Sequence, residues 1–318
     1  MNNILLMIIL CQLSVDSFQQ ILESEPDFVL FTEKPSEYPG SRFDIFEYYK
    51  LNDKRIMIRY SISDLDPLKI NLSIRNVLIK ENFEQKLYSY IKDLEKDQEV
   101  VIKRFYTGLF LLKLKGSTKT YVGVNMHLLQ DDKYEEAKKY NTVNGFFELV
   151  EKLMNNSEEI SNCRRYSVED IRSVLIKKFL KYADGDYDER IRGISVDILC
   201  YLGYWDNKYL KDSRKYVKIR YLSNAKEYNR ADLEDILIQS MNDEDIDIVS
   251  LSLIMVKNLS GSEKTERLKN AITEINKKYK QDRRRSKYLD MFTKTKEYPL
   301  FEVTNIILEH WDDKCEKF

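Results

Sequence analysis

The stretch Asp188–Gly203 reads D-E-R-I-R-G-I-S-V-D-I-L-C-Y-L-G, and it decides the fold that we expect for this chain. It begins with acidic residues, continues with an Ile-Arg step and then places apolar residues at helical spacing. A second stretch of this kind, D-I-D-I-V-S-L-S-L-I-M-V-K-N-L, occupies Asp245–Leu259, with Ile248-Val249 in place of Ile191-Arg192. Two such stretches predict that helical pairs repeat in the C-terminal half of the chain.

Helical patterns continue on both sides of these two stretches. A capping-box-like start at Ser167 precedes an apolar stripe that includes Phe179. Ser262 is expected to cap another helix, and Pro299 precedes the last one. We therefore expect about seven consecutive helices, joined by short links, over residues 158–318 as a solenoid or an irregular bundle.

The two stretches resemble HEAT repeats, and the resemblance covers only these C-terminal residues. HEAT repeats stack helical pairs into a solenoid that presents a long surface to a partner and carries no chemistry of its own. Val249 lies 57 residues after Arg192, whereas the family repeats every 40–47 residues or about that. An extra helix or longer loops are therefore expected between the copies. The alternative is an ordinary helical domain whose faces look repetitive.

Residues 18–157 are predicted to form a mixed α+β domain, an antiparallel sheet with two helices. Alternating apolar residues predict strands, and a glycine-containing turn at Gly116 predicts antiparallel pairing of the runs on either side of it. A polar stretch without periodicity, starting at Asn155, marks the expected end of this domain. The expected elements are a hairpin over residues 43–62, strands within 100–115 and 120–129, and helices at 82–95 and 143–154.

The N-terminus has the layout of a secretory signal peptide over residues 1–17. Ile4–Cys11 is an apolar run too short to span a bilayer, and polar residues follow it up to Ser17. We therefore expect a secreted or cell-envelope protein that begins at Phe18 after cleavage. Two alternatives stay open. The first is lipidation of Cys11, and we expect contact with a membrane only through that lipid. The second is a buried first strand or helix of a cytoplasmic protein.

The charge and composition favour a soluble, folded binding protein. The chain has 52 basic and 53 acidic residues and a net charge of −1, so no global field attracts it to nucleic acid or to an anionic membrane. It contains 22 Tyr, a residue favoured at protein interfaces because it combines an apolar ring with a polar tip. Codon bias of the genome is the alternative explanation for the tyrosines.

The motifs that carry chemistry point to no catalytic residue, no cofactor and no metal. His127 and His310 have no second His or Cys at ligand spacing, and the sequence contains no GxGxxG, Walker A or GxSxG motif. The acidic residues of 184–188 alternate as in a calcium loop, but Glu189 and Ser195 stand where an EF-hand has Gly and Glu. An interhelical turn with Asp186 or Asp188 as a helix cap is the expectation there.

A basic run at 277–287 is the strongest local charge feature. Its Arg283, Arg284, Arg285 and Lys287 could contact phosphates of nucleic acid, and DNA glycosylases built from helical repeats are a precedent. The alternative is a helix end whose cations face its C-terminal dipole. Nucleic acid is the less favoured partner because the net charge is close to zero.

The sequence as a whole predicts a non-catalytic protein-binding scaffold, an exported or envelope-associated inhibitor, immunity-type protein or adaptor. Its partner is expected to be another protein. The expected binding surface comprises Tyr201, Tyr204, Trp205 and Tyr209. Two alternatives stay open, a carboxylate-dependent hydrolase with a site between the domains and a HEAT-like nucleic-acid-binding protein.

Overall fold

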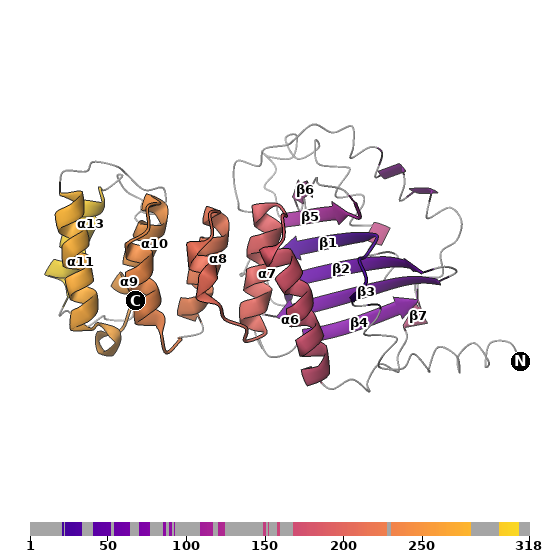
Figure 1. The fold of residues 1–318 in the computed structure, drawn as a ribbon, viewed down its shortest axis with the longest axis horizontal. Helices are drawn as coiled ribbons and strands as arrows, with labels where there is room; N and C mark the ends of the chain where they lie inside the picture. Colours follow the sequence, from indigo (N-terminus) through magenta and orange to yellow (C-terminus); the bar gives the residue numbers. More distant parts are fainter. Residues whose placement is uncertain are drawn as a thin grey trace, which may run out of the picture. The chain divides into compact units, whose positions relative to one another are not determined.

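The computed structural model shows an antiparallel sheet followed along the chain by a helical region (Figure 1). This order is the one that the sequence predicts. The chain divides into two compact units, Met1–Ile191 and Arg192–Phe318, and each is described by itself below. The described residues are 21, 23–33, 41–51, 54–63, 70–76, 85–86, 89–90, 92, 109–116, 120–124, 149–150, 152, 158–159, 168–227, 230–280 and 299–311.

The sheet has seven strands in the order β6-β5-β1-β2-β3-β4-β7, and all neighbours are antiparallel. The predicted hairpin is confirmed, since β2 and β3 pair from Leu51↔Lys54 to Ser41↔Ser63. The predicted pairing across the turn at Gly116 is also confirmed, and this glycine has a positive φ of 70°. The strands are β1 (Phe28–Glu33), β2 (Ser41–Leu51), β3 (Lys54–Ser63), β4 (Ile70–Asn76), β5 (Leu109–Leu114), β6 (Thr120–Val124) and β7 (Glu158–Glu159).

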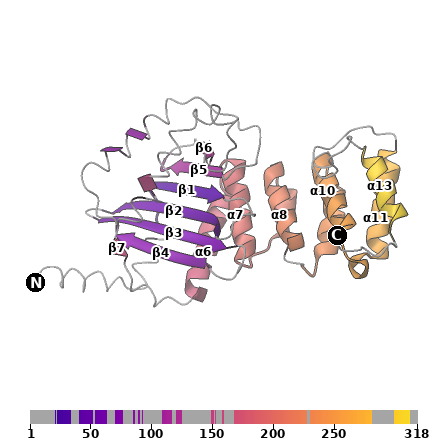
Figure 2. The ribbon, with the colours of Figure 1, turned by 180° about the vertical axis from the view of Figure 1, so that it is seen from behind.

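Both faces of the central strands are buried. Alternation along β2 puts Ile45, Glu47 and Tyr49 on one face and Asp44, Phe46 and Tyr48 on the other, and all six are buried. Opposite views show α6 (Val168–Asp184) lying against one face of the sheet (Figure 1, Figure 2). That face carries Glu47 and Tyr49, because both contact a lysine of α6.

The helix α6 belongs to the sheet unit, whereas the sequence placed the boundary between the domains after Ser157. The ring of Phe179 packs on Tyr60, with the ring centroids 6.4 Å apart, and Tyr182 packs edge-on against Phe31 at 5.7 Å. The difference has a physical reason: an amphipathic stripe shows that one face is covered but not whether a sheet or a helix covers it. The division of the units falls instead inside α7 (Glu189–Tyr201).

The helical unit continues with short, capped helices. Asp245 caps α10 by accepting from the Asp247 amide at 2.9 Å, and Thr265 caps α11 by accepting from the Leu268 amide at 3.2 Å. The predicted cap at Ser262 is wrong. Ser262 lies inside the short helix η6, and the residue that caps α11 is Thr265. The elements are η5 (Asn207–Lys211), α8 (Lys215–Glu227), α9 (Leu233–Met241), α10 (Ile246–Lys257), η6 (Gly261–Glu263), α11 (Glu266–Tyr279) and α13 (Leu300–Glu309).

The helices of this unit pack in sequential pairs, η5 with α8, α9 with α10 and α11 with α13. Three of these elements, η5, α8 and α9, lie between the two similar stretches, and they account for the spacing of those stretches in the sequence. Cys200 is buried as expected, and burial raises the pKa of its thiol. Among the described residues, no helix is both long and apolar enough to cross a membrane.

Several sequence-based expectations fall outside the residues that the structure describes. They are the signal peptide at 1–17 with Cys11, most of the helices expected at 82–95 and 143–154, and His127.

Candidate functional site

An aromatic side chain and an arginine meet on the helical unit beside η5. The guanidinium of Arg230 lies over the ring of Trp205, 4.6 Å from its centroid. Trp205 in turn packs edge-on against Tyr221, with the ring centroids 5.9 Å apart. We call Tyr204, Trp205 and Arg230 the aromatic–arginine edge, because all three are partly exposed.

Asp232 holds the arginine of this edge in place. Arg230 donates from Nε to Asp232 Oδ1 at 2.6 Å and from a terminal nitrogen to Oδ2 at 2.5 Å. These two hydrogen bonds lower the pKa of Asp232 and raise that of Arg230. A bidentate pair of this kind fixes the plane of the guanidinium as well as its position.

The structure separates the four aromatic residues that the sequence proposed as a binding surface. Tyr201 and Tyr209 are 3% and 2% exposed, which makes them core residues, whereas solvent reaches Tyr204 and Trp205. Tyr209 is buried because its ring packs on Tyr221, 6.0 Å away. The sequence did not indicate Arg230 as a binding residue. Its contact with Trp205 joins residues far apart in the chain, and no local pattern marks it.

The basic run of the sequence is only partly described. Lys277 pairs with Glu274 at 2.8 Å, and Lys278 lies over the ring of Tyr279. Arg283, Arg284, Arg285 and Lys287 lie outside the described residues. Their proposed contact with phosphates stays a prediction.

The acidic stretch before α7 is an interhelical turn. Asp188 caps the helix, since its Oδ1 accepts from the amide of Arg190 at 2.9 Å, and its carboxylate also binds the Arg190 side chain. The predicted cap is therefore confirmed at Asp188. Within the described ranges, no group of three or more His, Cys, Asp or Glu side chains is placed to hold a metal ion.

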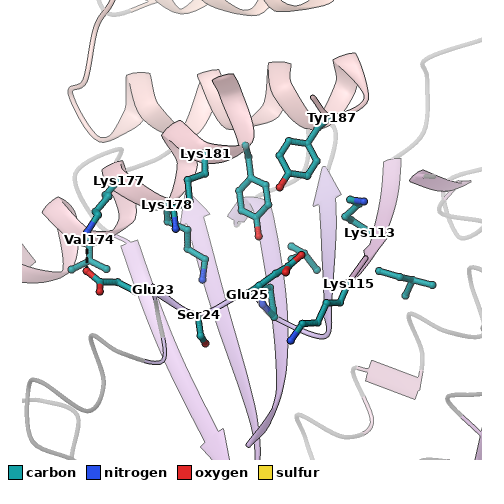
Figure 3. Close-up of a pocket in the computed structure, with 14 residues that line it drawn as sticks. Glu23, Ser24, Glu25, Lys113, Lys115, Val174, Lys177, Lys178, Lys181 and Tyr187 are labelled. Carbon is teal, nitrogen blue, oxygen red and sulfur yellow. Dashed lines mark hydrogen bonds and ion pairs between the residues drawn. The ribbon is translucent and has the colours of Figure 1, made fainter. Parts of the chain in front are cut away.

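A second candidate site is a pocket of about 350 Å³ in the sheet unit. Its walls come from α6, from the β5 end and from the segment Glu23–Pro26 before β1 (Figure 3). Lysines reach it from two sides, three from the helix and two from β5 and its turn (Figure 3). They are Lys113, Lys115, Lys177, Lys178 and Lys181. The sequence alone does not reveal this pocket, because its two groups of lysines are far apart in the chain.

A buried charge network adjoins this pocket through Lys178. Oε2 of Glu47, which is fully buried, accepts from the Lys178 amine at 2.6 Å and from the hydroxyls of Tyr49 and Tyr60 at 2.8 and 2.7 Å. Burial lowers the pKa of Lys178, although Glu47 opposes this, and burial raises the pKa of Tyr60. In the described part of the chain, Glu47 Oε1 has no hydrogen-bond partner.

The segment before β1 is tied to the sheet on both sides. The Asp27 amide donates to the Tyr48 carbonyl at 2.7 Å, and the Lys115 amide donates to the Asp27 carbonyl at 2.9 Å. The Asp27 carboxylate also accepts from the Lys50 amide at 2.6 Å. These bonds fix the pocket wall formed by Glu23–Pro26, which directly precedes Asp27.

Comparison of the chain with protein-family models, with curated proteins and with solved structures found no match. The resemblance to HEAT repeats therefore rests on the residues of Asp188–Gly203 and Asp245–Leu259 alone.

Proposed function

We propose that this chain is a non-catalytic protein-binding scaffold, and that its helical unit is a HEAT-like stack that presents the binding surface. The sequential pairing of η5–α8, α9–α10 and α11–α13 supports this proposal. In a stack of this kind each repeat contacts its neighbours, and the curvature of the stack creates an extended concave binding surface.

Ion pairs between helices support a rigid scaffold. Asp197 of α7 is fully buried and accepts from Arg220 of α8 at 2.9 Å and from Asn224 at 2.5 Å. Lys218 of α8 binds Asp243, in the turn before α10, at 2.7 Å. Buried, hydrogen-bonded charges fix the register between helices, because a shifted register would leave them unpaired.

The observation that carries the proposal is the aromatic–arginine edge. Trp, Tyr and Arg are the side chains that most often dominate the energy of protein interfaces. Here Arg230 is already held by Asp232 and stacked on Trp205. A partner that binds this edge would lose little side-chain entropy in ordering it.

The proposed partner is another protein, which this chain would mask as an inhibitor or immunity-type protein or recruit as an adaptor. The proposed location is outside the cytoplasm or at the cell envelope, because of the signal-like residues 1–17. Mass spectrometry of the protein's own N-terminus tests the location, and a chain that begins at Met1 would contradict it.

Affinity capture of the tagged chain from its native cell tests the function. The variants are Tyr204→Ala and Arg230→Lys, the second of which keeps the charge but loses the bidentate fork. The control is Lys257→Ala, which removes an exposed charge from α10. We expect wild type and control to recover the same protein at near-stoichiometric yield, and each edge variant to recover about tenfold less. Recovery of no protein, or equal recovery by all four chains, would contradict the proposal.

A further inference from the structure

The pocket of the sheet unit carries more positive charge than its own carboxylates neutralise. Lys177 pairs with Glu23 at 3.0 Å, and Lys178 pairs with Glu47. Among the described residues, Lys113, Lys115 and Lys181 have no carboxylate within ion-pair distance. Three cations around one cavity attract an anion of more than one charge.

Glu25 is the remaining carboxylate of the pocket lining. Burial lowers the pKa of Lys113, and the nearby Glu25 charge opposes that shift. Burial raises the pKa of Tyr187 and Tyr182, and the Glu25 charge adds to both shifts. The Glu25 carboxylate would repel a bound anion, so replacing it with a neutral side chain should strengthen anion binding.

Aromatic and apolar residues from several elements also line the pocket. Tyr182 and Tyr187 pack edge-to-face with ring centroids 5.4 Å apart, and Val29, Leu114 and Val174 also line the cavity. Lys113 lies over the Tyr187 ring at 5.7 Å, so the cationic and aromatic parts of the lining adjoin. Such a lining fits a ligand that has an apolar or aromatic body and a charged end.

Part of the pocket lining is held in place by the fold, whereas the side chains of Lys115 and Lys181 are exposed. Lys178 is 6% exposed and is oriented by Glu47, and the segment Glu23–Pro26 is fixed through Asp27 to β2 and β5. A preformed cavity of about 350 Å³ is within the range of sites for small molecules.

We propose that this pocket binds a small soluble phosphate monoester, with the phosphate among Lys113, Lys115 and Lys181 and the apolar body against Tyr182 and Tyr187. A phosphate monoester is favoured over a carboxylate because its charge at neutral pH is close to −2, whereas that of a carboxylate is about −1. Lysine ammonium groups on flexible stems suit phosphate as point charges. This site is separate from the aromatic–arginine edge, and its failure would leave the protein-binding proposal intact.

Calorimetric titration of the full chain with phenyl phosphate at low ionic strength tests the proposal. Inorganic phosphate and phenol serve as parallel probes, because each carries one half of the proposed ligand. The variants are Lys113→Ala, Lys181→Ala and Glu25→Gln, all at side chains that solvent reaches, and Lys257→Ala is the charge-matched control in the helical unit.

We expect phenyl phosphate to bind more tightly than either inorganic phosphate or phenol. Each pocket lysine variant should weaken binding about tenfold. Glu25→Gln should strengthen it severalfold, and Lys257→Ala should leave it unchanged. Added salt should weaken binding, because the attraction is between exposed charges.

Three results would overturn the proposal. The first is that phenyl phosphate fails to bind, and the second is that it binds no better than phenol or inorganic phosphate. The third is that Lys113→Ala and Lys181→Ala bind phenyl phosphate with the same affinity as the Lys257→Ala control, which would place the site elsewhere. Circular dichroism of each variant shows that a loss of binding is not a loss of fold, and Glu25→Gln supplies a gain that misfolding would not produce.

Discussion

At the scale of single residues, the buried tyrosines around Glu47 are groups whose ionisation the fold opposes. Burial raises the pKa of Tyr60, Tyr49 and Tyr182, and the Glu47 charge raises each further. In the unfolded chain these phenols titrate near pH 10. Above that pH the folded state holds more protons than the unfolded state. The free energy of unfolding therefore falls as the pH rises above about 10.

The variant Tyr60→Phe tests this reasoning at two pH values. At pH 7 we expect the free energy of unfolding to fall by about 1–3 kcal/mol, because Glu47 loses a buried donor. Above pH 10 the free energy of unfolding of the variant should fall less steeply with pH than that of the wild type. The difference in slope should be up to about 1.4 kcal/mol per pH unit, since one titrating group is gone. The lowered pKa of Lys178 makes the free energy of unfolding rise with pH, and this effect is present in both the variant and the wild type.

Urea unfolding followed by circular dichroism between neutral and alkaline pH gives both quantities. Tyr204→Phe is the control, because solvent reaches this side chain, and at pH 7 its free energy of unfolding should match that of the wild type. Equal alkaline slopes for Tyr60→Phe and wild type would show that Tyr60 ionises as easily in the folded chain as in the unfolded one.

At the scale of elements, the docking of α6 on the sheet depends on a charge pair that the sequence conceals. Lys178 stands among exposed cations, Lys177 and Lys181, and nothing local distinguishes it from them. Its partner Glu47 is 131 residues away in the chain. The stripe with Phe179 predicted the helix correctly, but the element that covers this stripe is decided by long-range contacts.

The variant Lys178→Met should lower the free energy of unfolding by about 3–5 kcal/mol, because it leaves the Glu47 charge buried without its cation. Adding Glu47→Gln should recover most of this loss. The amide oxygen still accepts from Tyr49 and Tyr60, and no charge is left buried.

Lys181→Met on the same helix is the matched control, since that lysine is exposed, and it should change stability by no more than about 0.5 kcal/mol. Denaturant unfolding of the four chains measures these differences. If the double variant were no more stable than Lys178→Met, the loss would come from packing rather than from the unpaired charge.

At the scale of the whole molecule, local patterns predicted the order of the elements, and they predicted less well how the elements are grouped. The alternation from Phe43 to Ile62 gave the β2–β3 hairpin, because pairing between neighbouring strands follows from a short turn. The cap at Asp188 could also be predicted, since capping is local. The division at Ile191 and the contact of Arg230 with Trp205 could not, because both depend on residues far apart in the chain.

The two compact units give the chain a way to unfold in two steps. Both tryptophans of the sequence, Trp205 and Trp311, lie in the helical unit, so tryptophan fluorescence reports on that unit alone. Far-UV circular dichroism reports on both units. Units that unfold independently give transitions that differ between these two probes.

We therefore expect a variant in one unit to leave the transition of the other unchanged. Leu253→Ala removes a fully buried side chain of α10 and should destabilise the helical unit by about 2–5 kcal/mol, with a lower midpoint of tryptophan fluorescence. Lys178→Met should shift the circular-dichroism transition of the sheet unit and leave the fluorescence midpoint in place. Urea titrations of both variants with both probes measure the four shifts. Coincident shifts of both probes in both variants would show that the chain unfolds as one cooperative unit, because a loss of packing in α10 would then be felt at Glu47.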